Sequence, residues 1–283
     1  MKEIKKAVTD DFDGMKISDY LRRSMELSVT LIKKVKFGGV FINGINVHMR
    51  AIVHTGDTVI VRLPEAKSEN IRPTTIPLDI IYEDDYLIAV NKPSGMPTHP
   101  SKGNSLPTLA EGIMAYFAGE SFVFRAINRL DRDTSGIVII AKDAVSADRL
   151  SGEMKRGGYV KKYSAIVCGV PSPAHAIIDA PIERESEGNI KRIVCEGGKR
   201  AITEYTVLKT LDNGDSLCEI TLHTGRTHQI RVHMAHIGHP LRYDFLYGVR
   251  EGDEIYKLHA KSIEFTHPFT KERLKLTSKE DFE

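Results

Sequence analysis

The stretch from Ile202 to His223, ITEYTVLKTLDNGDSLCEITLH, decides the fold class of this chain. It is expected to form a long hairpin, because Asn213-Gly214 at its centre is a strong signal for a tight turn between two strands. A second strand pair is expected earlier, where Ile80 to Glu83 and Tyr86 to Asn91 flank two acidic residues. Strands follow one another in pairs more often than they alternate with helices. The sequence therefore predicts an α+β fold, with a mainly antiparallel mixed sheet and flanking helices.

The helices of this fold are marked by apolar spacing. Residues 109–118 and 145–156 have helical periodicity, and Thr227 to Ile237 is expected to be a helix with Ile230 on its apolar face. The continuous apolar run from Gly136 to Ala141 is expected to be a buried strand. The chain shows no internal repeat and no low-complexity segment.

A smaller unit is expected at the N-terminus, over residues 13–63. Two helices are expected first, from Ile17 to Met25 and from Val29 to Phe37, and the glycine pair that follows ends the second one. The glycine pair leads into a strand at residues 40–43, and the turn at Gly56-Asp57 leads into another strand at residues 58–63.

A change in composition separates this unit from the rest of the chain. Residues 64–77, PEAKSENIRPTTIP, hold three prolines and few apolar side chains, which is typical of a linker. Residues 78–283 then form the large domain. A chain of 283 residues has room for one sizeable domain and one small companion.

The charge is unevenly distributed, although the net charge of +2 indicates no particular partner. Leu27 to Gly56 contains no acidic residue but several lysines, and Ile220 to Tyr243 is also free of acid and carries three arginines and five histidines. Two local basic stretches suit a polyanion such as RNA. By charge alone, solvated faces are the simpler interpretation.

The location of the protein follows from what the sequence does not contain. Three cysteines without paired spacing fit a reducing compartment, and the first residues lack the apolar core of a signal peptide. No segment approaches the roughly 18 continuous apolar residues that a membrane helix needs. We expect a soluble cytoplasmic monomer with no membrane partner.

One polar segment is a candidate for the catalytic residues. Residues 129–136, RLDRDTSG, lead directly into the apolar strand, and loops held by a rigid sheet are where catalytic groups tend to lie. Asp131 there could act as a nucleophile or a base, and an adjacent arginine would keep it ionised. A charged turn, in which Asp133 or Thr134 bonds to its own backbone, is at least as good an interpretation from these residues alone.

The loop also resembles the signature of RluA-type pseudouridine synthases, and three further segments resemble that family's motifs in the family's order. The resemblance covers about residues 78–283. The three segments are Tyr82 to Asp85 continuing through NKPSG (91–95) to His99-Pro100, then Lys162 to Ala165, and finally TGRTHQIRVH (224–233) with Gly238-His239-Pro240.

The N-terminal unit resembles the small RNA-binding domain first known from a ribosomal small-subunit protein, an S-four-like domain. Two helices, the glycine stop, VFING (40–44) and the closing Gly-Asp carry this resemblance, while Met15 to Ser18 stands where an Arg-Leu-Asp run is more typical. The resemblance implies that the basic side chains of this unit, Lys33, Lys34 and Lys36, contact RNA.

The resemblance implies an isomerase that converts uridine in RNA to pseudouridine. No atom is gained or lost, so no metal or other cofactor is expected. Asp131 corresponds to the family's catalytic aspartate, and Tyr163 to the tyrosine that stacks on a flipped-out uracil. Arg129 corresponds to the arginine that fills the vacated space, and Leu258 to the apolar residue packed against the base. Further candidates for contacts to RNA or to the active-site loops are Asn91, Lys92, Arg132, Gln229 and Arg231.

Arg226 is expected to pair with Asp131. It follows the hairpin and precedes a helix, where the helix dipole also favours a nearby carboxylate. The alternative is an arginine at the rim, whose surface salt bridge would contribute little. Two residues depart from the family pattern: Asn128 stands where His is common, and Arg242 where Gly is usual. They bear on loop detail and RNA preference rather than on the reaction.

Other functions remain open. The chain could be a non-catalytic RNA-binding protein, although an intact set of Asp131, Tyr163 and Arg226 argues against this. It could be a metal enzyme that uses the histidines of the second basic stretch, His223, His228, His233, His236 and His239. No carboxylate lies between Ile220 and Tyr243 to complete such a site. Within the family interpretation, large-subunit ribosomal RNA is favoured as the substrate and transfer RNA is the alternative.

Overall fold

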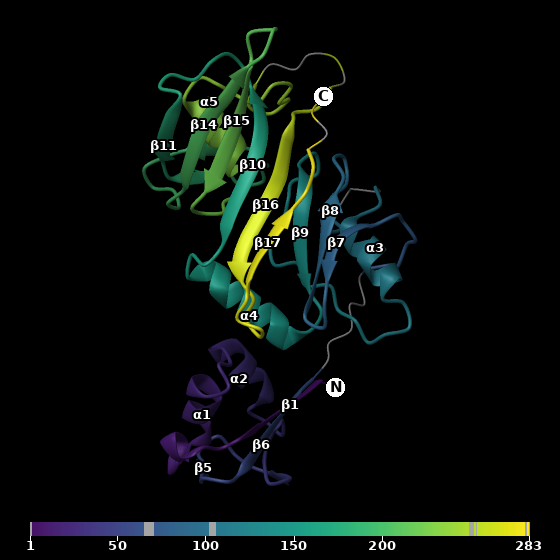
Figure 1. Cartoon of the computed structure of the whole chain (residues 1–283), viewed down its shortest axis with the longest axis vertical. Helices are drawn as coiled ribbons and strands as arrows, with labels where there is room; N and C mark the ends of the chain where they lie inside the picture. Colours follow the sequence, from purple (N-terminus) through teal and green to yellow (C-terminus); the bar gives the residue numbers. More distant parts are fainter. Residues whose placement is uncertain are drawn as a thin grey trace.

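The computed structural model describes residues 2–64, 71–101, 106–248, 252, 254–280 and 282. These residues form a large sheet and, below it in Figure 1, a small N-terminal unit with its own sheet. Part of the expected linker, residues 65–70, lies outside the described residues. Among the described residues, no helix has both the length and the apolar character that a membrane crossing requires.

The large sheet is mainly antiparallel, which confirms the predicted fold class. All of its neighbouring strands are antiparallel except β16 and β9, which run parallel. The order of its described strands is β11 (His175–Asp179), β14 (Ile202–Thr210), β15 (Ser216–Leu222), β10 (Val160–Val167), β16 (Leu258–Thr266), β9 (Ser135–Ala141), β8 (Leu87–Lys92) and β7 (Asp79–Glu83), with β17 (Arg273–Thr277) also on β16.

The fold-deciding hairpin is β14 and β15. Thr203 pairs with Leu222, and the ladder continues to Thr210 opposite Ser216. The connection is closed by a hydrogen bond from the Leu211 amide to the Asp215 carbonyl, and Gly214 has a φ of +83°, which favours glycine. A separate short ribbon pairs β12 (Ile182–Arg184) with β13 (Arg192–Val194).

Helices cover the large sheet as the sequence predicts. On one side, α3 (Leu109–Tyr116) and α5 (Gln229–His236) bury Ile113 and Ile230 in a core shared with Tyr163. On the other side, α4 (Ala144–Lys155) buries Leu150 against β9 and β16. The N-termini of α3 and α4 are capped, since Thr108 forms a capping box at α3 and Asp143 accepts two amide hydrogen bonds at α4.

The second half of the expected linker packs against the large domain. Ile71 is buried in the main core, and Ile76 lies against α3 at Gly112. A Cβ at Gly112 would come within 2.4 Å of the Ile76 side chain, so only glycine allows this close approach.

The N-terminal unit starts earlier than residue 13. Its sheet has the order β1 (Lys2–Ala7), β6 (Thr58–Leu63), β3 (Val40–Ile42) and β4 (Ile45–Asn46). β1 lies outside the expected unit and is not predicted from the sequence. The two expected helices are α1 (Ile17–Arg23) and α2 (Val29–Val35), and the remaining elements are η1 (Asp10–Phe12), β2 (Met15–Lys16) and β5 (Ile52–Val53).

The small unit is joined to the large domain through α4, which lies between them in Figure 1. The Ser28 amide donates to Asp148 Oδ2 at 2.9 Å, and Arg149 Nη2 donates to the Met25 carbonyl at 3.2 Å. Val145 of α4 is buried in the core of the small unit. This contact fixes where the small unit lies relative to the sheet.

Candidate active site

A cavity of about 530 Å³ opens beside loop 129–134, between strand β10 and the start of α5. It collects most of the site residues predicted from the sequence. Those that line it are Asp131, Tyr163, Arg226, Arg129, Leu258, Arg132, Gln229 and Arg231. Asn91 and Lys92 do not line it and instead border a second cavity, of about 520 Å³.

The close approach of two strands explains why the loop ends in a glycine, Gly136. Gly136 lies in the short parallel contact between β9 and β16, where it pairs with Ala260. A Cβ on Gly136 would lie 2.5 Å from the Ala260 carbonyl oxygen, and the φ of Gly136 is +108°. Any other residue would push the two strands apart and move the loop. Ser135 adds a contact to the same strand, with Oγ 2.9 Å from Nδ1 of His259.

Asn128 anchors the other end of the loop. Its side-chain amide donates to the Ile137 carbonyl at 2.9 Å and accepts from the Ile139 amide at 2.9 Å, so it holds the chain against β9. Arg242 is the other departure from the family pattern. Its Nε lies 3.6 Å from Oδ2 of Asp215, at the end of the hairpin turn. Both side chains are therefore used in local contacts, and neither reaches Asp131.

The two acidic residues of the loop have different surroundings. Asp133 is buried and receives two hydrogen bonds of 2.8 Å from the guanidinium of Arg132. The carboxylate of Asp131 is 29% exposed and faces the first cavity. Arg132 therefore forms its ion pair with Asp133 and not with Asp131. Asp131 is the carboxylate of the loop that a substrate can reach.

The predicted pairing of Asp131 with Arg226 is wrong. Arg226 is exposed, and its Nε donates to the Arg200 carbonyl at 3.0 Å. The partner is Arg231, whose Nη1 lies 3.4 Å from Asp131 Oδ2. Arg226 precedes α5 in a turn at the surface, whereas Arg231 lies within the helix on its buried side. Arg226 still lines the same cavity.

Arg231 is held rigidly by groups that the sequence analysis did not identify. Asp244 receives two hydrogen bonds from its guanidinium, at 2.7 and 2.8 Å, and is itself fully buried. The rings of Tyr256 and Tyr247 lie 4.4 and 5.1 Å from the guanidinium carbon. Burial acts to lower the pKa of Arg231, but the hydrogen bonds to Asp244 and the electrostatic interactions with Tyr256, Asp244 and Asp131 together outweigh it and raise the pKa above its ordinary value. Arg231 is therefore a permanent cation beside Asp131.

His228 is a further neighbour of Asp131. Its Nε2 lies 3.8 Å from Asp131 Oδ2, and its Nδ1 lies 2.8 Å from the hydroxyl of Tyr247. Its backbone is left-handed, with a φ of +57°, at the residue before α5. Burial lowers the pKa of His228, while the charge of Asp131 acts in the opposite direction. From the sequence, His228 is expected only as a candidate metal ligand and not as a neighbour of Asp131.

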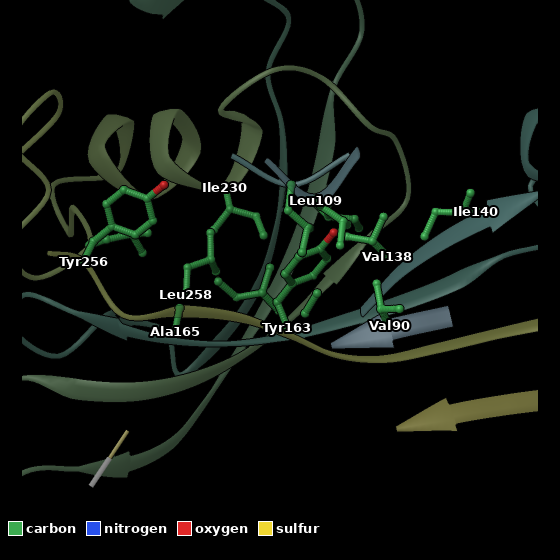
Figure 2. Close-up of a cluster of buried hydrophobic side chains, with 14 of the residues drawn as sticks. Val90, Leu109, Val138, Ile140, Tyr163, Ala165, Ile230, Tyr256 and Leu258 are labelled. Atoms are coloured by element: carbon green, nitrogen blue, oxygen red, sulfur yellow. The ribbon is translucent and has the colours of Figure 1, made fainter. Parts of the chain in front are cut away.

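Tyr163 on β10 and Leu258 on β16 form part of the apolar wall of the cavity. Figure 2 shows both side chains near Ile230 of α5, and all three are buried. Burial and the nearby charge of Asp131 both raise the pKa of Tyr163, so its hydroxyl keeps its proton near neutral pH. A flat ring and a branched apolar side chain in one wall suit a planar ligand.

Three of the lower-ranked candidates are used inside the protein. Lys92 is fully buried and donates to the carbonyl oxygens of Pro93, Met96 and Arg132, at 2.9, 2.7 and 3.0 Å. It supports the active-site loop through the Arg132 carbonyl and does not face a ligand, so of the two roles expected for Lys92 the structure shows the contact to the loop. Burial lowers the pKa of Lys92 to about 7, while the charges of Asp133 and Asp131 act to raise it.

Gln229 and Asn91 are also tied to their own surroundings. The amide oxygen of Gln229 accepts from the Thr224 hydroxyl and the Arg226 amide, and its NH₂ group donates to the Ile202 carbonyl and to the Thr203 hydroxyl. Its side chain is therefore fully used in shaping the turn. Asn91 donates to Asp79 at 2.9 Å, away from Asp131.

The predicted contacts at the cavity rim are Arg129 and Arg132. Arg129 is exposed and forms no hydrogen bond or ion pair with any residue that the structure describes. The guanidinium of Arg132 is engaged with Asp133, although the side chain remains 48% exposed. The guanidinium of Arg129 is thus available to a ligand. That of Arg132 is available only in part, because it also binds Asp133.

The histidines of the second basic stretch do not come together. In the described part of the chain, no group of three His, Cys, Asp or Glu side chains is arranged to hold a metal ion. His223 lies 2.8 Å from Glu204, and His239 lies 2.8 Å from the Cys168 carbonyl. His233 is buried between Thr203 and the Ala180 carbonyl. Their separate partners give them local structural roles.

The fold and the cavity define an enzyme whose partly exposed carboxylate lies beside a fixed arginine and a flat apolar wall. A family model described as RNA pseudouridylate synthase matches residues 86–236. The chain is 37% identical to the RNA pseudouridine synthase YjbO of Bacillus subtilis, over 88% of this chain and 90% of that protein. It is 34% identical to the ribosomal large subunit pseudouridine synthase D of Xylella fastidiosa, over 84% and 76% of the two chains.

A solved structure agrees with these relatives. Human RNA pseudouridylate synthase domain containing 1 matches with a TM-score of 0.62 and 27% identity, over 75% of this chain and 88% of that one. The chain therefore belongs to the RNA pseudouridine synthase family, of the RluA type that its motifs predicted. It is an isomerase that acts on RNA.

Proposed function

We propose that Asp131 starts the conversion of uridine to pseudouridine in this enzyme, and that Arg231 holds it ionised and oriented. The observation that carries the proposal is the position of Asp131 Oδ2, which is open to the cavity and 3.4 Å from Nη1 of a permanently charged arginine. A fixed cation stabilises a neighbouring carboxylate and favours its charged form.

The reaction needs a charged carboxylate, an enclosed space and little else. The bond between C1′ of the ribose and N1 of uracil breaks, and a bond between C1′ and C5 forms. The proton on C5 leaves and N1 gains one, so atoms and charges balance without an oxidant or an energy carrier. The freed base must turn while water is kept away, and the wall formed by Tyr163 and Leu258 supplies a flat apolar surface for it.

Base flipping brings the uridine to this wall. A base inside a duplex cannot reach Asp131, and extruding it costs a few kcal/mol of lost stacking. Arg129 has an unengaged guanidinium at the rim, and this planar group suits the space that the base leaves. Arg226, which is also exposed at the rim, suits a backbone phosphate better than the carboxylate with which it was first paired.

We further propose that the substrate is large-subunit ribosomal RNA, modified in the cytoplasm by a monomer. The ribosomal substrate is supported by the names of relatives that are 33–38% identical, among them synthases of the ribosomal large subunit from Xylella fastidiosa and Zymomonas mobilis. The N-terminal unit acts as the S-four-like RNA-binding domain, because Lys33, Lys34 and Lys36 are all exposed on it.

The test follows the proton that C5 loses. RNA carrying tritium at C5 of uridine should release tritium to water when the wild-type protein is added, and Asp131→Asn should release none. Mapping pseudouridines in ribosomal and transfer RNA, from cells with and without the gene, identifies the substrate. Sites that disappear only from transfer RNA would contradict the ribosomal assignment.

A further inference from the structure

Phe37 is an aromatic side chain that the fold of the N-terminal unit leaves in solvent. It follows α2 and is 85% exposed, more than any other large apolar residue that the structure describes. The valines on either side of it in the sequence, Val35 and Val40, are each 1% exposed and form the core instead. Phe37 therefore contributes little to the stability of the unit, and its exposure calls for another explanation.

The surroundings of Phe37 are strongly cationic. The Nζ of Lys36 lies 4.5 Å from the centre of the Phe37 ring, so a cation and an aromatic face are presented together. Lys33 and Lys34 are exposed one turn earlier on α2, and none of the three lysines forms an ion pair with a described residue. The whole stretch from Leu27 to Gly56 contains no acidic residue.

This surface also lies at the free end of its helix. The first residues of α2 are at the contact with the large domain, where the Ser28 amide bonds to Asp148 of α4. A seven-residue helix is about 10 Å long, so Lys36 and Phe37 lie at the end turned away from that contact. The ring is therefore accessible in the intact protein.

We propose that Phe37, with Lys36 beside it, is a stacking platform for an unpaired nucleobase of the RNA substrate. Every base has a flat face that stacks on an aromatic ring, and the adjacent lysines neutralise the phosphates on either side of it. A protein partner would need a contiguous apolar patch, but Phe37 is flanked by Lys36 and by Gly38-Gly39. The inference rests on the proposed function, because it assigns a further contact to the RNA that the active site modifies.

The absence of tryptophan from the chain makes a direct test available. Phe37→Trp introduces a single tryptophan, and its emission, excited selectively at about 295 nm, should be quenched on titration with a short single-stranded RNA of mixed sequence. A perfectly paired RNA duplex should quench it much less at the same concentration. Ile177→Trp is the matched control, because Ile177 is 61% exposed on the large domain and faces Glu204 across the strand pair. It should show no quenching with either RNA.

Two further variants separate stacking from apolar area. Phe37→Ala should weaken binding of the single-stranded RNA by about five- to a hundredfold, the range expected for the loss of one stacked base. Phe37→Leu keeps an apolar side chain without a π face and should be nearly as weak. Both should raise KM for a folded RNA substrate and leave kcat unchanged, and neither should alter the melting temperature.

The possible results distinguish this site from the proposed function. If Phe37→Trp is not quenched and Phe37→Ala binds RNA normally, while the wild type forms pseudouridine, the stacking platform does not exist. If the wild type forms no pseudouridine, the proposed function fails, and the fluorescence titration still decides whether Phe37 stacks on a base.

Discussion

Two cavities of similar volume, about 530 and 520 Å³, border the same catalytic loop and share Leu258, but their charged groups differ. In the second cavity the two buried charges have protein partners, since Asp133 is paired with Arg132 and Lys92 bonds to three carbonyl oxygens. In the first, Asp131 is partly exposed and makes only longer contacts, of 3.4 Å to Arg231 and 3.8 Å to His228. The two cavities therefore differ in their charged groups and not in their volume. The incompletely satisfied charge of Asp131 is what marks the first cavity as the reactive site.

The largest expected effect is that of Asp131→Asn. The amide keeps the shape of the side chain but loses the charge, so pseudouridine formation should fall to background while RNA binding stays within a few-fold of wild type. Single-turnover tritium release and filter binding measure the two quantities. Asp133→Asn is the matched control on the second cavity, and it should lower the melting temperature. Measurable turnover by Asp131→Asn would remove Asp131 from the mechanism.

Arg231→Lys should have the next largest effect. Lysine keeps the charge but cannot bind Asp244 through two parallel hydrogen bonds, so the cation beside Asp131 loses its fixed position. We expect a loss of about 1.5–3 kcal/mol in transition-state stabilisation, or about ten- to a hundredfold in kcat. Asp244→Asn should move kcat in the same direction, although Asp244 does not contact the cavity.

Arg226→Lys is the control for this prediction. Because Arg226 is exposed, its loss should cost about 1 kcal/mol or less and should appear in RNA affinity rather than in kcat. If the two arginine variants were equally slow at saturating RNA, the assignment of Arg231 as the partner of Asp131 would be contradicted.

Lys92→Met tests whether Lys92, which borders the second cavity, stabilises the folded protein. Removing the ammonium leaves three loop carbonyls without their donor, which should lower the free energy of unfolding by about 1–3 kcal/mol. The wild type should also depend on pH. With a pKa of about 7 when folded and about 10.4 when unfolded, Lys92 binds more protons in the unfolded chain between these values.

Wild-type stability should therefore rise relative to Lys92→Met as the pH increases from about 7 toward 10. Urea unfolding of both proteins at several pH values measures the difference. Parallel stability curves would show that Lys92 is protonated equally in the folded and unfolded states.

The smallest effect is expected far from both cavities, where Lys33, Lys34 and Lys36 are replaced by glutamine. Each contact with single-stranded RNA contributes about 0.7 to the slope of log K against log salt, so the slope should fall by about 2. The kcat at saturating RNA should not change, because none of the three side chains lines the catalytic cavity. An unchanged salt slope would mean that this surface does not bind phosphate.

Local sequence determined much of the molecule. The turn at Gly214, the caps of α3 and α4 and the apolar strand after the catalytic loop all depend on residues within a few positions of one another. Propensity and periodicity act over that range, which is why the hairpin, the helices and the fold class could be predicted. β1 was missed because an edge strand such as KEIKKA has little apolar signal of its own.

The family motifs also placed Asp131, Tyr163 and Leu258 in one region, and the structure brings all three to one cavity. The tertiary structure alone decided which arginine meets Asp131. Residues 131 and 231 are 100 positions apart, and their contact depends on where α5 packs against the sheet. Arg226 and Arg231 are equivalent as charges in the sequence, but only the one inside the helix is buried with Asp244. Likewise, only packing reveals that Lys92 supports the loop from within.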